Sequence, residues 1–126
     1  MQFKVKEVDT KGLQSKFAQA NEAALWALAK NARADCQPYI PYETGALRRS
    51  GRENIQNGTA YIEWGGDAKT SQYARVQYYK TLNHSTPGNA ANALQATDHW
   101  VEHARAVRGQ AWEKLYAKVL GEKLGK

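Results

Sequence analysis

The sequence predicts an α+β fold in which long N-terminal and C-terminal helices pack on a small antiparallel β-sheet. Two long stretches, one from residue 11 to about 36 and one from about 97 onwards, repeat apolar residues every three or four positions, as amphipathic helices do. Between them, Asn57-Gly58 separates two short segments and is typical of a tight hairpin turn. Because each helix has one apolar stripe to bury, a shared sheet surface serves both.

The composition predicts a single domain spanning residues 1–126. Domains are most often about 100–150 residues long, and a hydrophobic content of 42% with a charged content of 24% is typical of globular proteins. The only cysteine, Cys36, has no partner for an intrachain disulfide. The N-terminus lacks the apolar run of a signal peptide, and no segment approaches the roughly 20 apolar residues of a membrane span. We therefore expect folding by packing alone in a reducing compartment, without a membrane.

Three short strands are expected to form the sheet. The first covers residues 2–8, and its side chains alternate between two sides, namely Phe3 and Val5 against Lys4 and Lys6. The other two, residues 52–56 and 59–64, flank the Asn-Gly turn as a hairpin. Large apolar side chains of the last strand share one side and are expected to face the core: Ala60, Ile62 and Trp64.

The N-terminal helix is predicted over residues 11–36. Asp9 or Thr10 could cap it with a side-chain oxygen, and Pro38 should end it because its ring removes Gln37 from the helical region. The residues of its apolar stripe are Leu13, Phe17, Ala20, Ala24, Leu25, Leu28 and Ala32.

The C-terminal helix should begin near Thr97 or Asp98, either of which could cap it, and fray at Gly121 and Gly125. Its apolar stripe consists of Trp100, Ala104, Val107, Ala111, Leu115 and Val119, broadened by Trp112, Tyr116 and Leu120. Before it, residues 38–50 should form an ordered extended loop that tightens at Thr44-Gly45 and can be followed by a turn of helix, and residues 73–79 should form a short helix or strand. The polar stretches 65–71 and 85–96 read as loops that engage partners.

Histidines provide the only hint of a metal site. His99 and His103 are four residues apart and share a helix face, with His84 and Cys36 as conceivable further ligands. The glutamate of a zinc-protease helix is missing from its position, so surface or interface histidines are the preferred interpretation. Catalytic carboxylate pairs, nucleophile elbows and phosphate loops have no counterpart in the sequence. We expect no cofactor, and the sequence offers no reason to predict an enzyme.

Charge supports an alternative function. The net charge is +6 and the pI about 9.5, and the densest basic cluster is formed by Arg48, Arg49 and Arg52. A DNA-binding module would use these arginines beside nearby aromatic residues. Four tryptophans and seven tyrosines suit either a protein interface or the edge of the core. Trp64 and Trp100 are expected in the core.

Three blocks of sequence, in this order, resemble phage minor capsid and head–tail joining proteins. The first is a proline followed by Thr-Gly-x-Leu-x-x-Ser, formed by Pro41, Thr44, Gly45, Leu47 and Ser50, with Arg48 inside it. The second is Tyr73-Ala74-Arg75 with Gln77-Tyr78-Tyr79, and the third combines residues 84–87 with residues 96–102, which include His99 and Trp100. The similarity covers most of residues 10–120, although the stretch between the two parts of the third block departs from the usual pattern.

The resemblance implies a non-catalytic ring subunit of the neck or of tail completion. Its implied partners are further copies of the chain and the phage connector or tail proteins, with at most incidental contact with genomic DNA and with neither a membrane nor a small-molecule substrate. The implied location is the virion neck or tail after assembly and the host cytoplasm before it. The motif residues that it implies at interfaces are Pro41, Thr44, Gly45, Leu47, Arg48, Ser50, Tyr73, Arg75, Tyr78, Tyr79, His99 and Trp100.

The first block also has a physical interpretation. Gly45 permits a backbone turn that other side chains hinder, and Thr44 can bond to nearby backbone amides. Leu47 can anchor the loop on the core while Arg48 and Arg49 project for ion pairing. The alternative is an intramolecular clasp between the first helix and the hairpin. The sequence leaves both interpretations open.

Overall fold

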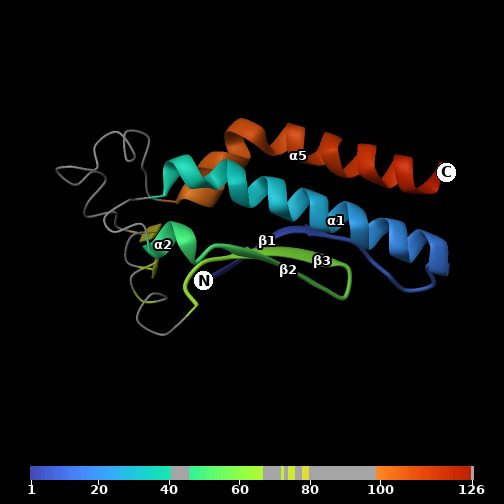
Figure 1. The fold of residues 1–126 in the computed structure, drawn as a ribbon, viewed down its shortest axis with the longest axis horizontal. Helices are drawn as coiled ribbons and strands as arrows, with labels where there is room; N and C mark the ends of the chain where they lie inside the picture. The colour runs from blue at the N-terminus through green and yellow to red at the C-terminus, as the bar shows by residue number, and fades with distance from the viewer. Residues whose placement is uncertain (41–45, 67–71, 73, 76–77, 80–98, 126) are drawn as a thin grey trace.

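The computed structural model describes residues 1–40, 46–66, 72, 74, 75, 78, 79 and 99–125. In chain order its elements are β1 (Gln2–Glu7), α1 (Ser15–Cys36), the 3-10 turn η1 (Gln37–Tyr39), α2 (Ala46–Arg49), β2 (Arg52–Gln56), β3 (Thr59–Glu63) and α5 (Trp100–Leu124). Figure 1 shows α1 and α5 side by side in opposite directions, with the sheet along α1. The predicted α+β class, with two long helices on a small antiparallel sheet, is confirmed.

The sheet has the strand order β1-β3-β2, and both pairings are antiparallel. The predicted hairpin is present, with positive φ at Asn57 (49°) and Gly58 (82°), as a type I′ turn requires. The predicted inner face of the last strand is also confirmed, because Ala60, Ile62 and Trp64 are buried.

β1 departs from simple alternation. Its register with β3 shifts between Lys4 and Lys6, so that Lys6 pairs with Ala60 of the inner face. An extra residue in one strand turns the following side chains to the other side. The Lys6 ammonium accordingly lies 2.9 Å from Glu113 and 4.7 Å from the centre of the Tyr116 ring, both on α5. The prediction that Lys4 and Lys6 share a side was wrong because alternation cannot reveal a bulge.

Helix α1 begins later than predicted. Its N-cap is Gln14, which makes no side-chain cap bond, and the Asp9 side chain instead accepts a hydrogen bond from the Lys11 amide, 2.9 Å away, in the preceding turn. The helix ends at Cys36, as predicted, and Pro38 falls inside η1. Gln37 nevertheless keeps a helical backbone (φ −53°, ψ −45°), so the expectation that Pro38 removes it from the helical region was wrong. The chain tightens into a 3-10 turn there and becomes extended only at Ile40. The central residues of the predicted stripe are buried: Ala20, Ala24, Leu25, Leu28 and Ala32.

Helix α5 also has a different cap from the predicted one. His99 is its N-cap, with a left-handed backbone (φ 48°) and no side-chain cap bond. At the other end the helix continues through Gly121 to Leu124, with Gly125 as its C-cap. Val107, placed in the apolar stripe by its spacing, is 58% exposed. The repeat identified the helix, but Val107 lies on the side that no described element covers.

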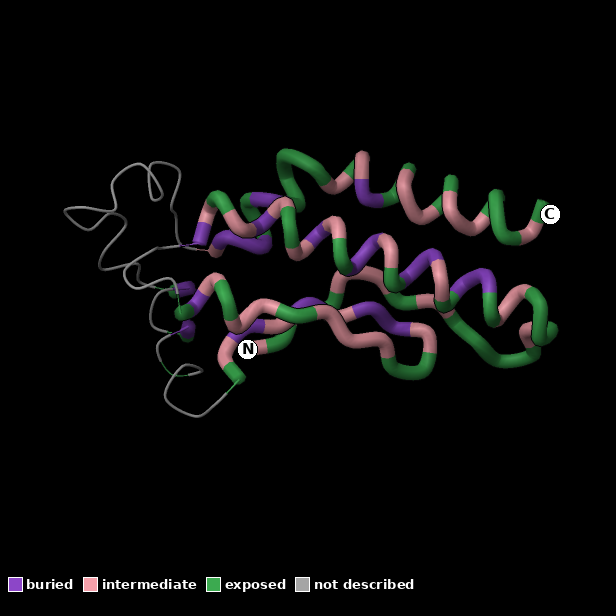
Figure 2. The backbone as a smooth tube through the Cα atoms, viewed as in Figure 1, coloured by how far each residue is buried: buried purple, intermediate pink, exposed green. Residues whose placement is uncertain are grey.

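The core lies between α1, the sheet and the first half of α5. Figure 2 shows buried residues spread along α1 and concentrated at the beginning of α5. The largest fully buried side chains are Trp64, Trp100, Leu25, Leu28, Ile40 and Ile62. Both tryptophans predicted for the core are therefore in it.

Candidate functional site

The described parts of the three sequence blocks meet at one end of the molecule. Leu47 of the first block, Tyr78 of the second and Trp100 of the third are all buried in the same core cluster. Figure 1 shows α2, the end of α1 and the beginning of α5 at this end. Segments far apart in the sequence therefore build one site.

The first block forms what we call the clasp, made of Gln37, Ile40, Leu47, Arg48 and Ser50. The Arg48 guanidinium donates two hydrogen bonds to the carbonyl of Ile40, through Nε at 3.1 Å and Nη2 at 2.8 Å. The Gln37 amide in turn donates to the Arg48 carbonyl at 3.2 Å, and Leu47 is 3% exposed. These contacts tie α2 to the end of α1.

Ser50 extends the clasp to the sheet. Its hydroxyl donates to the Leu47 carbonyl at 2.6 Å and accepts a hydrogen bond from the Gly65 amide at 2.9 Å. The next residue, Gly51, lies against the Trp64 ring, so that a Cβ there would come within 2.6 Å of Nε1. The end of the motif is thus fitted closely to the residues that follow β3.

These contacts give Arg48 a role that the sequence did not predict. We expected its side chain to project for ion pairing, and its guanidinium also binds the Ile40 carbonyl within the chain. The carbonyl of a fully buried residue needs a donor, and a guanidinium supplies several in one plane. Pro41, Thr44 and Gly45 lie outside the described residues, so the predicted turn is untested. An interface role for the block stays a prediction.

Aromatic side chains of the second and third blocks pack together beneath the clasp. The Tyr78 ring lies 4.7 Å from Trp100 and 4.8 Å from Phe3, and Trp100 lies 6.0 Å from Trp64. The two contacts of Trp100 are edge-to-face, which aromatic quadrupoles favour. Burial raises the pKa of Tyr78 from 10.0 to about 12. We call these four residues the aromatic cluster.

The exposed margin of the cluster joins the same two blocks. The His99 amide donates to the Tyr78 carbonyl at 2.8 Å, and the His99 ring lies 5.4 Å from Tyr79. Tyr79 is 59% exposed, and Arg75 is exposed as well. Tyr73 lies outside the described residues. The predicted motif residues that the structure describes therefore contribute both a buried base and an exposed margin.

The two histidines of the metal hypothesis have different neighbours. His99 packs against Tyr78 and Tyr79, whereas the His103 ring lies 4.4 Å from Tyr39. Across residues 1–40, 46–66 and 99–125 and the five described residues between, no three His, Cys, Asp or Glu side chains gather as a metal site. Cys36 is fully buried, and burial together with nearby Asp35 raises its pKa from 9.0 to about 12. His84 lies outside the described residues. The geometry lends a metal centre no support.

Among the arginines of the DNA-binding alternative, Arg48 and Arg52 make contacts within the chain, although Arg49 and Arg52 are exposed. Arg52 pairs with Glu63 across the hairpin, and Arg48 binds the Ile40 carbonyl. Phosphate binding needs guanidinium groups directed to solvent. The DNA-binding alternative stays a prediction, with Arg48 engaged by the Ile40 carbonyl and Arg52 by Glu63.

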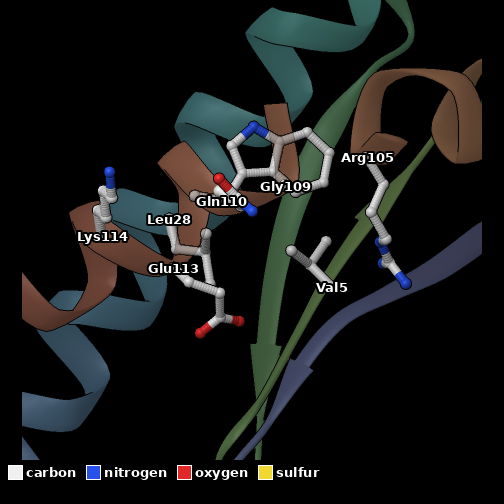
Figure 3. Close-up of a pocket in the computed structure, with 8 residues that line it drawn as sticks. Val5, Leu28, Arg105, Gly109, Gln110, Glu113 and Lys114 are labelled. Atoms are coloured by element: carbon white, nitrogen blue, oxygen red, sulfur yellow. The ribbon is translucent and has the colours of Figure 1, made fainter. Parts of the chain in front are cut away.

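Sequence reasoning missed a groove between β1 and α5, shown in Figure 3. It has a volume of about 640 Å³, and Val5, Trp112 and Arg105 are among its lining residues. Arg105 reaches across to donate a hydrogen bond to the Lys4 carbonyl at 2.7 Å. Gly109 also lines it, where a Cβ would lie 3.3 Å from the Arg105 side chain. A lone glycine inside a helical pattern was the available signal.

Sequence reasoning also missed the polar link between the helices. Asp35 on α1 accepts a hydrogen bond from the Trp112 indole at 2.7 Å, and Arg108 lies 3.5 Å away. Such long-range pairs leave no trace in sequence spacing.

Comparison with protein families decides what kind of protein this is. The model of the family described as "Minor capsid protein" matches residues 3–120. The chain belongs to the minor capsid protein family. Membership makes this minor capsid protein a phage structural protein associated with the virion. Comparison with curated proteins and with solved structures produced no match. Among the described helices, none has the length and apolarity needed to cross a bilayer.

Proposed function

We propose that this minor capsid protein is a non-catalytic subunit of a homo-oligomeric ring in the head–tail joining region, at the neck or in tail completion. It would contact the phage connector or tail proteins in the virion and reside in the host cytoplasm before assembly. The observation that carries the proposal is the convergence of the three blocks, with exposed Tyr79 and Arg75 above a base of buried aromatic residues.

An assembly surface needs anchors held by a rigid support. Tyrosine and arginine are enriched among the residues that dominate binding energy at protein interfaces. Here Tyr79 follows directly after Tyr78, whose ring packs on Trp100. The Tyr79 ring in turn packs against the ring of His99. A surface residue supported in this way loses little conformational freedom on binding.

The chemistry of the clasp supports a structural role. A catalytic centre requires ionisable or nucleophilic groups that converge on a cleft. The polar groups of the clasp bind backbone atoms instead: Arg48 binds the Ile40 carbonyl, and Ser50 bridges Leu47 and Gly65. Their described bonds hold segments of the chain together.

The test is assembly with the connector and tail proteins of the same phage, followed by light scattering and electron microscopy. We expect rings on the connector or tail end with the native protein, and weaker association with Tyr79→Ala. Val107→Ala is the matched control, since it removes a comparably exposed apolar side chain elsewhere and should assemble normally. Absence of association with connector and tail proteins under every assembly condition would contradict the proposal.

A further inference from the structure

Two surface features are left open by the part of the chain that the structure describes. Trp26, on the outer side of α1, is 42% exposed. β2, over which α1 lies, is an edge strand of the sheet. An open strand edge can pair with a strand of another chain, and an exposed tryptophan on the helix that lies over this strand can add a large apolar contact to such a pairing.

The two edges of the sheet are treated differently. The β1 edge is interrupted by the bulge between Lys4 and Lys6. The Arg105 guanidinium also donates a hydrogen bond of 2.7 Å to the Lys4 carbonyl. Both features hinder the addition of another strand. β2 pairs with β3 in regular register from Arg52 to Gln56, and no described residue bonds to its outer side. The bulge and the arginine contact are thus confined to the β1 edge.

The hairpin determines which groups of β2 face outward. Its two-residue turn is closed by the pair Gln56 and Thr59, which is hydrogen-bonded in such turns. Because bonded and non-bonded pairs alternate in an antiparallel ladder, Asn54 also bonds to β3. Glu53 and Ile55 then direct their amides and carbonyls to the open side.

We propose that this face is a homodimer interface. In the dimer, β2 pairs antiparallel with β2 of a second copy about a two-fold axis that passes Asn54. The same axis passes Trp26, so that α1 packs against α1 of the second copy. The inference goes beyond the ring proposed above, because it concerns a different surface and does not include the exposed margin at Tyr79.

The register of β2 suits pairing with itself. With Asn54 on the axis, Glu53 lies opposite Ile55 of the second copy, and each such pair exchanges both of its backbone hydrogen bonds. Arg52 then lies opposite Gln56, so that like charges do not face each other. Asn54 lies opposite Asn54 of the second copy, and the two form a non-hydrogen-bonded pair.

The helices meet at the same axis. The Arg33–Glu53 ion pair on one side, and a hollow lined by Leu25 and Ile55 on the other, place the stretch of α1 between Leu25 and Arg33, which includes Trp26, above Asn54. Strands lie about 4.8 Å apart, so two α1 helices above their own β2–β3 pairs would stand about 10 Å apart. That is an ordinary distance for packed helices.

The charges of α1 are complementary in this arrangement. Glu22 and Lys30 lie four residues before and after Trp26, on the same exposed stripe. Neither forms an ion pair within the described part of the chain. In an antiparallel pair of helices centred on Trp26, Glu22 faces Lys30 of the second copy, and Lys30 faces Glu22. Because the contact is two-fold symmetric, the pair between Glu22 and Lys30 forms twice in the dimer.

A cysteine on the axis tests the register. Asn54→Cys should form an intermolecular disulfide under mild oxidation, because directly opposed non-hydrogen-bonded positions lie about 4.5 Å apart. Arg52→Cys is the matched control, since its two copies would be separated by about 13 Å of strand. The native Cys36 is buried and should not react. Equal crosslinking of the two variants, or none in either, would overturn the proposal.

Charge reversal tests the helix contact, with sedimentation equilibrium of the full chain as readout. Glu22→Lys should weaken dimerisation about tenfold, because two attractive pairs become repulsive. The double variant Glu22→Lys with Lys30→Glu should restore the native affinity. Glu122→Lys, an equal charge change on α5, should have no effect. A native chain that stays monomeric at millimolar concentration, or a double variant no better than the single one, would refute the dimer.

Discussion

The two ends of the α1–α5 pair are packed differently although the same apolar repeat runs through both. At the clasp end, Trp100 of the aromatic cluster is buried, and so are Val101 and Ala104, which belong to the same core. Beyond Trp112 the apolar residues of α5 are only half-buried: Leu115, Tyr116, Val119 and Leu120. A repeat therefore specifies a helix face, while the elements opposite decide how far that face is buried.

Polar contacts supplement the packing at the open end. The Tyr116 hydroxyl donates a hydrogen bond to the side chain of Asn21, a buried residue of α1. Lys6 lies over the Tyr116 ring and reaches Glu113, and burial raises the pKa of Tyr116. The clasp end is held mainly by buried rings, and the open end by a mixture of half-buried apolar and polar groups.

The largest expected effect comes from Trp100→Ala. Removing this fully buried ring should lower the free energy of unfolding by about 3–5 kcal/mol. Leu120→Ala, at the half-buried end, should cost about 1 kcal/mol or less. Urea denaturation of both variants measures the difference, and equal losses would show that the two ends are packed alike.

A smaller effect is expected within the clasp. Arg48→Met keeps much of the side-chain volume but leaves the Ile40 carbonyl without its two donors, which should cost about 1–3 kcal/mol. Arg108→Met is the matched control, because that arginine is 53% exposed and lies 3.5 Å from Asp35. The control should change stability by less than about 1 kcal/mol. If both variants lose the same amount, the clasp contributes no more than a surface ion pair.

The last expected effect, confined to alkaline pH, is a pH dependence at the clasp end. The pKa of Cys36 is raised from 9.0 to about 12, mainly by burial, so the folded state keeps the thiol protonated after the unfolded chain ionises. Its contribution to stability is complete below pH 9 and is lost as the pH rises from 9 towards 12. The urea midpoint of Cys36→Ala, measured from pH 8 to 11, should therefore fall less steeply than that of the native protein. Parallel curves would contradict the expectation.

Much of the site followed from local sequence. The Asn57-Gly58 turn, the inner face of β3 and the burial of Leu47 were all predicted and are present. The contact between Arg48 and the Ile40 carbonyl and the inward side of Lys6 were not predicted. Both depend on segments that approach each other only after folding.

By itself, the sequence determined the helices, the hairpin and the resemblance to minor capsid proteins, since periodicity, turn chemistry and motif spacing are properties of neighbouring residues. Only the tertiary structure decided that His99 caps α5, that Val107 stays exposed and that one sheet edge is open. Each of these depends on which surfaces meet in space. A residue is buried only when two surfaces meet, and a single stretch of chain supplies only one of those two surfaces.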